Sequence, residues 1–417
     1  MKNVIQERYA IDNASILFLA QMRKDHTNSF RFSMTLTDPI CPVTLQKAVD
    51  QVYHRFPTVI AGFRSGFFGY FQIPAKNPPK VQKDPGCLIT MTKEELKECA
   101  YRVYYSGNTI AIEAFHALTD GYGAIASFTT LVAEYLHLMH HITIPISYTL
   151  LDITMPPEPQ ELEDSFLTYE QQTSDRLPSR YAYQLPGRQE PRKSIKKTTY
   201  TVPSQKLLDA AHQYGVSANT LLSAVMADTI MEIQKNKKTG KLQPVRIMVP
   251  VNLRKLFPSS TLRNFSYYVL PTMEPEEAGK PLCDLVNSFG QQIRAQMAKE
   301  QMAALITNNV KLQKNPLFCV IPLVLKRSLM RIICRFFGET NSSVTVTNLG
   351  NVVLPEEMKA YVEHMDVTLT PRMLSPYGCA ILSYNGLLTI NISRFTAEAE
   401  LDSVFFRKLD SILNNEA

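Results

Sequence analysis

The residues best suited to catalysis lie together at 113–123, in the stretch Glu-Ala-Phe-His-Ala-Leu-Thr-Asp-Gly-Tyr-Gly. An apolar run over 109–115 leads into His116, and Asp120 and Gly121 follow after three intervening residues. A histidine can take up a proton near neutral pH, so His116 is a candidate general base. Asp120 can act as its partner or can anchor the loop that holds it. The structural alternatives are a histidine hydrogen-bonded at a strand end and an aspartate that caps the next helix.

The sequence around this motif predicts the elements that hold it. Apolar residues alternate over 30–36, which predicts a half-buried strand, and a helical pattern begins at Pro42. After the motif, apolar residues over 125–139 have helical spacing. The order of strand, helix, strands, motif and helix is typical of an α+β domain.

A second α+β unit is predicted from residue 198 onward. An alternating strand over 198–202 precedes two helices that begin near 204 and 217. Further strands are expected at 245–251, 343–347, 378–384 and 387–392. Asn385-Gly386, between the last two, predicts a tight type I′ hairpin.

Between the two units, residues 154–197 are rich in proline and end in a basic cluster, Arg192, Lys193, Lys196 and Lys197. This composition is typical of a linker or crossover and argues against a buried element. We therefore expect a first domain over 1–175, which carries the histidine motif, and a second over 176–417. The basic cluster can meet the phosphates of CoA, but a solvated linker is the interpretation that we favour.

Composition and charge exclude several classes of protein. A net charge of +6 over 417 residues, without a long Lys/Arg tract, does not favour nucleic-acid binding. The seven cysteines are scattered without a C-x-x-C pair, so neither a zinc site nor a disulfide framework is indicated. His137, His140 and His141 lack acidic partners at metal-binding spacing, so no metal is expected. The N-terminus lacks the apolar core of a signal peptide, and we expect a cytoplasmic protein.

The most apolar later segment, 318–337, is interrupted by four basic residues, Lys326, Arg327, Arg331 and Arg335. These charges argue against a transmembrane helix. The arginines form one stripe over 325–337, so this part can lie on a membrane surface and deliver a lipophilic acceptor. We favour a core-packed helix with a solvated basic face over such peripheral contact.

Four segments, in a fixed order along the chain, are informative when they are considered together. They are Leu45-Gln-Lys-Ala-Val with Arg55-Phe-Pro, the motif at 116–121, Val249-Pro-Val-Asn252-Leu-Arg254 with Asn264-Phe265, and Val344-Thr-Val-Thr-Asn348-Leu-Gly350. With these residues the chain resembles the CoA-dependent acyltransferase superfamily. That superfamily includes chloramphenicol acetyltransferase, dihydrolipoyl acyltransferases, plant BAHD acyltransferases, alcohol acetyltransferases and the condensation domains of nonribosomal peptide synthetases. The likeness is greatest to stand-alone alcohol acetyltransferase-like or condensation-like proteins.

The resemblance implies two similar α+β domains, with mixed sheets flanked by helices and an active-site tunnel between them. It implies that His116 takes a proton from an alcohol or amine while that group attacks a thioester carbonyl. It also implies that Asp120 turns away from His116 and pairs with Arg254, which follows Asn252. Gly121 would let the backbone turn without a Cβ clash. The alternative for Arg254 is a plain surface residue.

The fourth segment supplies candidates for substrate contacts. A hydroxyl of Thr345 or Thr347 can stabilise a tetrahedral oxyanion, although both are also favourable strand residues. Asn348 and Gly350 either contact substrate or make a turn.

Three departures from the family patterns concern subfamily and substrate. Phe115 stands where condensation domains commonly carry a first histidine. The BAHD pattern Asp-Phe-Gly-Trp-Gly is absent, and the chain has no tryptophan. The segment 348–350 is more similar to the Ser-Asn-Leu-Gly of dihydrolipoyl acyltransferases.

Together these residues predict an acyltransferase that moves an acyl group from a CoA thioester to an alcohol, with His116 as general base. The expected co-substrate is acyl-CoA or an acyl-pantetheine, and no permanently bound cofactor is expected. One alternative is amide or ester formation from a thioester on a carrier protein. The other is a catalytically silent binding protein on the same scaffold.

Overall fold

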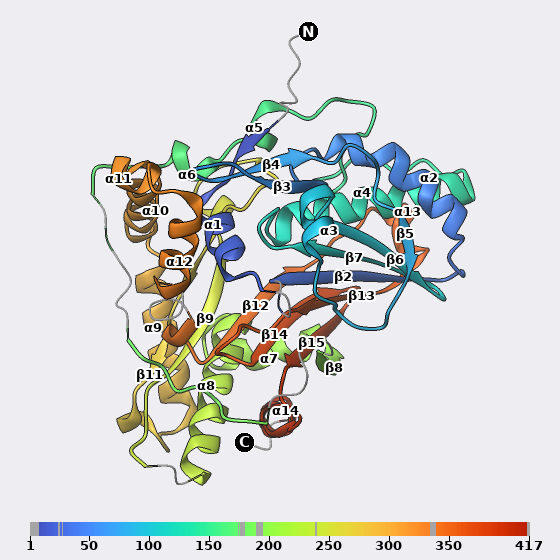
Figure 1. The fold of residues 1–417 in the computed structure, drawn as a ribbon. Coiled ribbons are helices and arrows are strands. Elements are labelled where there is room, and N and C mark those ends of the chain that lie inside the picture. Colours follow the sequence, from blue (N-terminus) through green and yellow to red (C-terminus); the bar gives the residue numbers. More distant parts are fainter. Residues whose placement is uncertain are drawn as a thin grey trace.

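The computed structural model describes residues 8–23, 26, 28–173, 175, 180–188, 195–237, 240–333 and 339–414. Two large mixed sheets, each flanked by helices, and one small sheet make up the fold (Figure 1). The α+β class predicted from the sequence is therefore confirmed.

The first large sheet carries the histidine motif. Its strand order is β13-β2-β7-β6-β5, and its neighbours are antiparallel except for the parallel pair β5–β6. The strands are β2 (Ser29–Leu36), β5 (Val81–Lys83), β6 (Tyr101–Ser106), β7 (Thr109–Phe115) and β13 (Val362–Leu369). The edge strand β13 comes from the far end of the chain, so late residues complete the sheet of the first half.

The second large sheet has the strand order β10-β9-β12-β14-β15-β8, with β11 paired to β9. Its centre is parallel, because β12 runs parallel to both β9 and β14. Asn385 and Gly386 both have positive φ, 47° and 77°, which confirms the tight hairpin predicted between β14 and β15. The strands are β8 (Lys196–Pro203), β9 (Val245–Asn252), β10 (Ser266–Val269), β11 (Thr272–Met273), β12 (Val344–Asn351), β14 (Tyr377–Tyr384) and β15 (Leu387–Arg394).

The third sheet is small, with the order β1-β4-β3. It is formed by β1 (Tyr9–Ala10), β3 (Ala61–Ser65) and β4 (Tyr70–Pro74). The longer helices are α1 (Asn13–Gln21), α2 (Pro42–Val52), α4 (Gly121–His140), α7 (Ser204–Gln213), α8 (Ala218–Asn236), α9 (Leu282–Gln296), α10 (Lys299–Lys314), α12 (Leu323–Ile333) and α14 (Glu400–Leu413). The shorter ones are α3 (Lys93–Glu98), α5 (Pro159–Leu162), α6 (Ser165–Thr168), α11 (Pro316–Cys319), α13 (Glu356–Lys359) and the 3-10 turns η1 (Tyr53–Arg55), η2 (Leu253–Lys255), η3 (Pro275–Glu277) and η5 (Glu339–Asn341).

Two hydrophobic cores fill the molecule, one for each large sheet. The first lies under α2 and α4, and the second is covered by α8, α9 and α14 (Figure 1). Val362, Met365 and Val367 of β13 belong to the first core. The domain boundary near residue 175 stays a prediction.

The proline-rich stretch differs from expectation. Leu162 and Phe166 are buried, so the expectation of no buried element over 154–197 is wrong. The stretch packs on both halves: Glu161 accepts hydrogen bonds from both guanidinium Nη atoms of Arg55, and Phe166 belongs to the second core. Of the basic cluster, Lys197 pairs with Asp366 of β13 at 2.6 Å, whereas Arg192 and Lys193 lie outside the described residues.

Helix α12 also differs from expectation. Leu325 and Ile332, which were expected to pack in the core, are 62% and 57% exposed, so that part of the prediction is wrong. Arg331 of the basic face is exposed as expected, and the buried side of the helix carries Leu323 and Met330 instead. The packing of this helix is described below. Arg335 lies outside the described residues. None of the helices in the described part combines the length and apolar character needed to cross a membrane.

Candidate active site

His116 stands directly after β7, where the strand turns toward α4. Its backbone N–H donates to the carbonyl of Asn28 at 2.8 Å, so the neighbouring strand end holds the residue in place. Phe115, one position earlier, is fully buried in the first core. The strand therefore delivers the imidazole from a rigid support.

Two aromatic rings enclose the imidazole of His116. Phe18 of α1 stacks on it with ring centres 4.4 Å apart and an interplanar angle of 17°, and Phe30 of β2 meets it edge-on at 5.0 Å. Burial lowers the pKa of His116 below its ordinary 6.5, because the charged imidazolium loses its water. Its own carbonyl, Asp120 and Asn264 act weakly in the opposite direction. Burial therefore favours the neutral ring, the form that accepts a proton.

Several buried polar atoms around the imidazole lack hydrogen bonds. Within the described part of the chain, Nδ1 of His116, both amide atoms of Asn264 and Oδ2 of Asp12 have no partner of hydrogen-bond geometry. Asn264 influences the pKa of both His116 and Asp12, so its amide lies near both. Oδ2 of Asp12 lies 3.7 Å from Nη2 of Arg263. Buried polar atoms without partners are uncommon and indicate a place where a ligand can supply the missing bonds.

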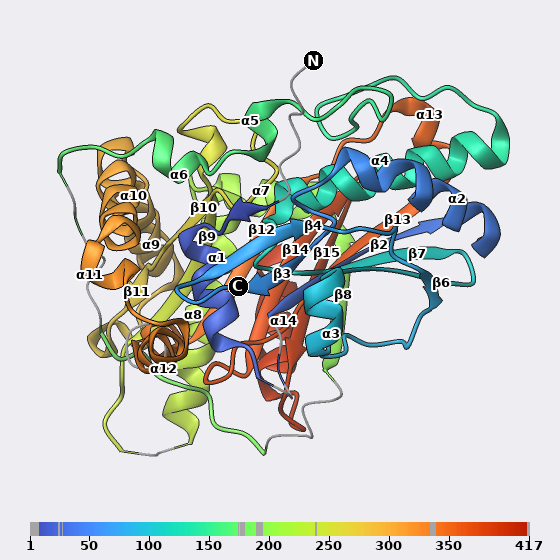
Figure 2. The ribbon, with the colours of Figure 1, turned by 45° about the horizontal axis from the view of Figure 1, so that its top comes forward.

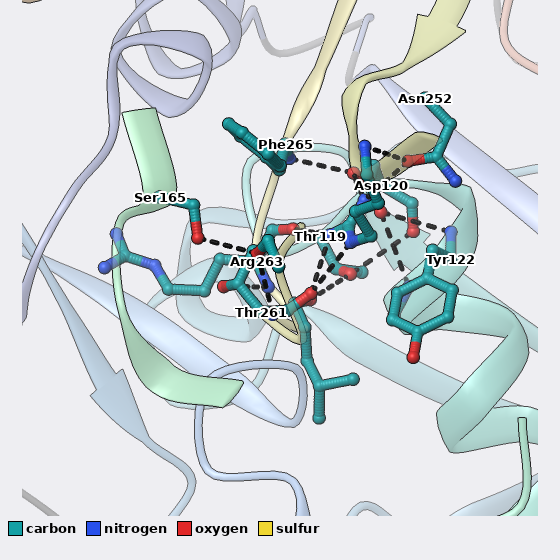
Figure 3. Close-up of polar contacts among 12 residues, drawn as sticks. Thr119, Asp120, Tyr122, Ser165, Asn252, Thr261, Arg263 and Phe265 are labelled. Carbon is teal, nitrogen blue, oxygen red and sulfur yellow. Dashed lines mark hydrogen bonds and ion pairs between the residues drawn. The ribbon is translucent and has the colours of Figure 1, made fainter. Parts of the chain in front are cut away.

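Asp120 differs from His116, because both oxygens of its carboxylate accept two hydrogen bonds each. Oδ1 accepts from the backbone N–H groups of Tyr122 and Gly123 at 3.1 and 3.4 Å, which caps α4. Oδ2 accepts from Nη1 of Arg254 at 2.7 Å and from the backbone N–H of Phe265 at 2.8 Å. Figure 3 shows Asp120 among these groups, between the start of α4 and the segment from the second half.

Arg254 completes this junction between the two halves. Its Nε and Nη2 donate to the carbonyl of Thr261, and Nη2 also donates to the carbonyl of Arg263. The side-chain oxygen of Asn252 accepts from the backbone N–H of Arg254 at 3.1 Å and from its Nη1 at 3.3 Å. The ion pair predicted between Asp120 and Arg254 is present, and Arg254 is only 9% exposed, so the surface alternative is wrong.

Both glycines of the motif lie close to the second half, and the requirement is stricter at Gly123 than at Gly121. Gly121 is not among the glycines with positive φ, and a Cβ there would stand 2.7 Å from Cδ2 of Leu349, a side chain that can move. A Cβ on Gly123 would stand 2.1 Å from the carbonyl oxygen of Leu262 and 2.3 Å from Oγ1 of Thr119. The start of α4 therefore packs directly on backbone from the second half.

Strand β12 passes beside the motif. Val344 and Val346 are buried in the second core, so alternation places Thr345 and Thr347 on the opposite face. The Oγ1 of Thr345 donates to the sulfur of Met248 at 3.7 Å. No hydrogen bond within the described chain joins Thr345 or Thr347 to His116, so their role at an oxyanion stays a prediction.

The end of β12 forms a turn. The side-chain oxygen of Asn348 accepts from the backbone N–H of Gly350 at 2.8 Å, and Gly350 has φ +76°. The register with β14 shifts here, between 348 and 351. These observations support the turn interpretation of Asn348 and Gly350, while Leu349 between them reaches Gly121.

Sequence reasoning did not identify Phe18, Asp12 and Asn264 as parts of this site. Asn264 lay in one of the four matched segments, which was the available signal. Asp12 caps α1 and, with Ser15, ties that helix to the carbonyl of Ala117 next to the histidine. In the described residues, no group of three or more histidine, cysteine or acidic side chains is arranged to hold a metal ion.

No protein-family model and no curated protein matches the sequence. Solved structures match along nearly the whole chain. Polyketide synthase associated protein 5 from Mycobacterium tuberculosis is 13% identical, with a TM-score of 0.62 over 97% of each chain. A trichothecene 15-O-acetyltransferase from Fusarium sporotrichioides is 10% identical, with a TM-score of 0.60 over 97% of this chain and 94% of that one.

The starter condensation domain of rhizomide synthetase, in complex with C8-CoA and Leu-SNAC, is also similar. It is 15% identical, with a TM-score of 0.59 over 98% of this chain and 94% of that chain. At such identities the likeness concerns the fold. The chain therefore has the fold of condensation domains and CoA-dependent acyltransferases, as its four matched segments predicted.

Proposed function

We propose that the protein transfers an acyl group from a thioester to an alcohol, with His116 as general base. The observation that carries this proposal is a buried imidazole at the end of a strand, enclosed by Phe18 and Phe30 and close to the amide of Asn264. Because Nδ1 is buried, Nε2 is the nitrogen left to meet a substrate. A neutral hydroxyl is a weak nucleophile, and an imidazole that removes its proton during attack makes it competent.

The acyl group passes directly from the thioester to the acceptor, without a covalent enzyme intermediate. Nε2 of His116 takes the hydroxyl proton as the acceptor oxygen bonds to the thioester carbonyl carbon. The resulting oxyanion is held by a hydroxyl of Thr345 or Thr347, or by the side-chain N–H of Asn264. Collapse of the intermediate breaks the carbon–sulfur bond, and the departing thiolate takes the proton from the imidazolium. The products are an ester and a free thiol, and His116 is neutral again.

A second candidate is condensation of an amine with a carrier-protein thioester. Condensation domains are among the solved structures that share this fold, which favours this candidate. The same base would act on an amine, and only the source of the thioester and the acceptor would differ. A catalytically silent binding protein is the third candidate.

The experiment offers the full chain CoA thioesters of increasing acyl length with panels of alcohols and amines. Free thiol is measured with a chromogenic disulfide, and products are identified by mass spectrometry. We expect His116→Ala to lower kcat/KM by about 10²–10⁴-fold, the usual contribution of a general base. The matched control is His54→Ala, because His54 is exposed and lies outside this site.

The outcomes separate the three candidates. Thiol release that depends on His116 and on an alcohol supports the proposal. Release only from phosphopantetheinylated carrier proteins supports condensation instead. If wild type and His116→Ala release thiol equally with every donor and acceptor, the protein is not a catalyst of this kind.

A further inference from the structure

The exposed apolar side chains of this protein are concentrated on one part of its surface. Of the nineteen large hydrophobic residues exposed in the described chain, ten come from α1, the turn between β3 and β4, and residues 312–332. We call these ten the apolar face: Leu17, Phe67, Phe68, Leu312, Leu317, Val320, Val324, Leu325, Leu329 and Ile332. A concentration of this kind marks an interaction surface, because single exposed hydrophobic residues are otherwise scattered.

The segments that carry the apolar face are joined to one another. The backbone N–H of Leu323 donates to the carbonyl of Phe67 at 2.8 Å, and Nζ of Lys326 donates to the carbonyl of Phe68 at 2.7 Å. Phe318 and Met330 form a small buried cluster with Ala20 of α1. Figures 1 and 2 both show α12 beside α1.

Helix α12 buries Leu323 and Met330 on one side but exposes a second apolar side to solvent. Lys326 is turned inward, where its ammonium meets a carbonyl and the ring of Phe318 at 4.7 Å. Arg331 is bound to the carbonyl of Ala20 through Nε at 3.1 Å. Leu325, Leu329 and Ile332, which share one side of the helix by their spacing, are 62%, 41% and 57% exposed. A helix that meets only water on its outer side would carry polar residues at these three positions.

The charge of these segments has one sign. Residues 13–23, 61–74 and 311–333 contain no aspartate or glutamate. They contain seven cations, Arg23, Arg64, Lys311, Lys314, Lys326, Arg327 and Arg331. Lys314 is paired with Glu170 from outside these segments. An apolar surface with basic residues and no acidic ones is complementary to a bilayer that carries anionic headgroups.

We propose that the apolar face docks on the surface of a membrane that contains anionic lipids. Phe67 and Phe68, at the tip of a turn, insert between headgroups, and α12 lies in the interface with Leu325 and Ile332 toward the acyl chains. Arg64 and Arg331, which are exposed, and the half-buried Arg327 are attracted to the lipid phosphates. The proposal does not depend on the acyl-transfer reaction. It does place the membrane beside α1, the helix whose Phe18 covers His116.

The test is flotation of the full chain with vesicles of phosphatidylcholine, with or without phosphatidylglycerol. We expect binding to the anionic vesicles that weakens as salt rises. The double variants Phe67→Ser/Phe68→Ser and Leu325→Ser/Ile332→Ser should each weaken binding roughly tenfold or more, since each removes the burial of two large side chains. Arg64→Gln/Arg327→Gln should weaken binding to anionic vesicles alone.

Matched controls come from exposed apolar residues on other helices. Val43→Ser on α2 and Leu208→Ser on α7 should leave vesicle binding unchanged, because these residues lie outside the apolar face. Circular dichroism and thermal melting verify that each variant is folded. Sedimentation velocity tests whether a second copy of the chain covers the face.

Three results would overturn the proposal. The first is wild-type protein that remains unbound with both kinds of vesicle. The second is equal loss of binding in the controls and in the apolar-face variants. The third is a dimer that the apolar-face variants dissociate, with no vesicle binding by the wild type. Acyl-transfer activity can be present or absent in any of these cases, so the two proposals fail separately.

Discussion

His116 and Asp120 stand four positions apart on one loop, yet their hydrogen bonding is opposite. The carboxylate of Asp120 accepts four hydrogen bonds, two from the start of α4 and two from the second half. Nδ1 of His116 makes no hydrogen bond of good geometry within the described residues, and its polar neighbours are its own carbonyl and the amide of Asn264. The Asp120 end of the motif is saturated with hydrogen bonds to the protein, and the His116 end is left open to further ones.

This difference assigns separate roles to the two residues. A buried polar group without any partner costs about 1–3 kcal/mol, and a poorly satisfied one costs part of that, so the His116 end of the motif does not stabilise the fold. The saturated end offsets part of that cost, because Asp120 and Arg254 join the two halves at the loop. The comparison indicates a structural role for Asp120, and the proposed function assigns the reactive role to His116. The predictions below test this separation.

The largest stability effect is expected at the saturated end. Arg254→Ala leaves the buried carboxylate of Asp120 without its cation, and breaking a buried pair in this way costs about 3–5 kcal/mol. Unfolding in urea, followed by circular dichroism, measures the loss. Activity should fall together with stability, because the loop that holds His116 loses its anchor.

The control for this prediction is Arg407→Ala. Arg407 also pairs with a carboxylate, Glu232 at 3.5 Å, but its side chain is 70% exposed. Solvent screens such a pair, so the expected loss is below about 1 kcal/mol. Equal losses in the two variants would mean that the Asp120–Arg254 junction does not stabilise the protein as its burial suggests.

The sequence predicted local elements well because their signals are local. The alternation over 30–36 corresponds to β2, the helix after Pro42 to α2, and Asn385-Gly386 to a hairpin with both residues at positive φ. Strand β13 was missed, since its partner β2 lies more than three hundred positions earlier and pairing at that distance leaves no local pattern. Helix α12 was misjudged because periodicity shows that a helix has two faces, but not which face meets the protein.

The sequence predicted the ion pair of the site but not the residues that pack against the motif. An aspartate and an arginine in matched segments suggested their pairing. The stacking of Phe18 on His116 depends on how α1 folds back over the loop, which neither segment specifies. The need for Gly123 likewise comes from the carbonyl of Leu262, about 140 residues away in the sequence.

An intermediate effect is expected at Gly123. Gly123→Ala places a Cβ 2.1 Å from the carbonyl oxygen of Leu262, so α4 must shift away from the second half. Overpacking of this kind costs about 1–3 kcal/mol. The control is Gly121→Ala, whose Cβ would meet only the movable side chain of Leu349, with an expected change within about 1 kcal/mol. Thermal unfolding of both variants measures the difference, and a larger loss for Gly121→Ala would contradict the assignment.

The smallest effect is expected at His116, in the pH dependence of activity. Burial lowers the pKa of His116, so kcat/KM of the wild type should rise with pH to a plateau with its midpoint below 6.5. Phe18→Leu removes the stacked ring and admits water, which favours the charged imidazolium. The pKa should then rise toward 6.5, and the midpoint should move upward by less than about one pH unit. Phe63→Leu, a change to a core ring packed on Phe115, should leave the midpoint unchanged even if it destabilises the protein. A midpoint that stays fixed in Phe18→Leu would mean that α1 does not control the solvation of the base.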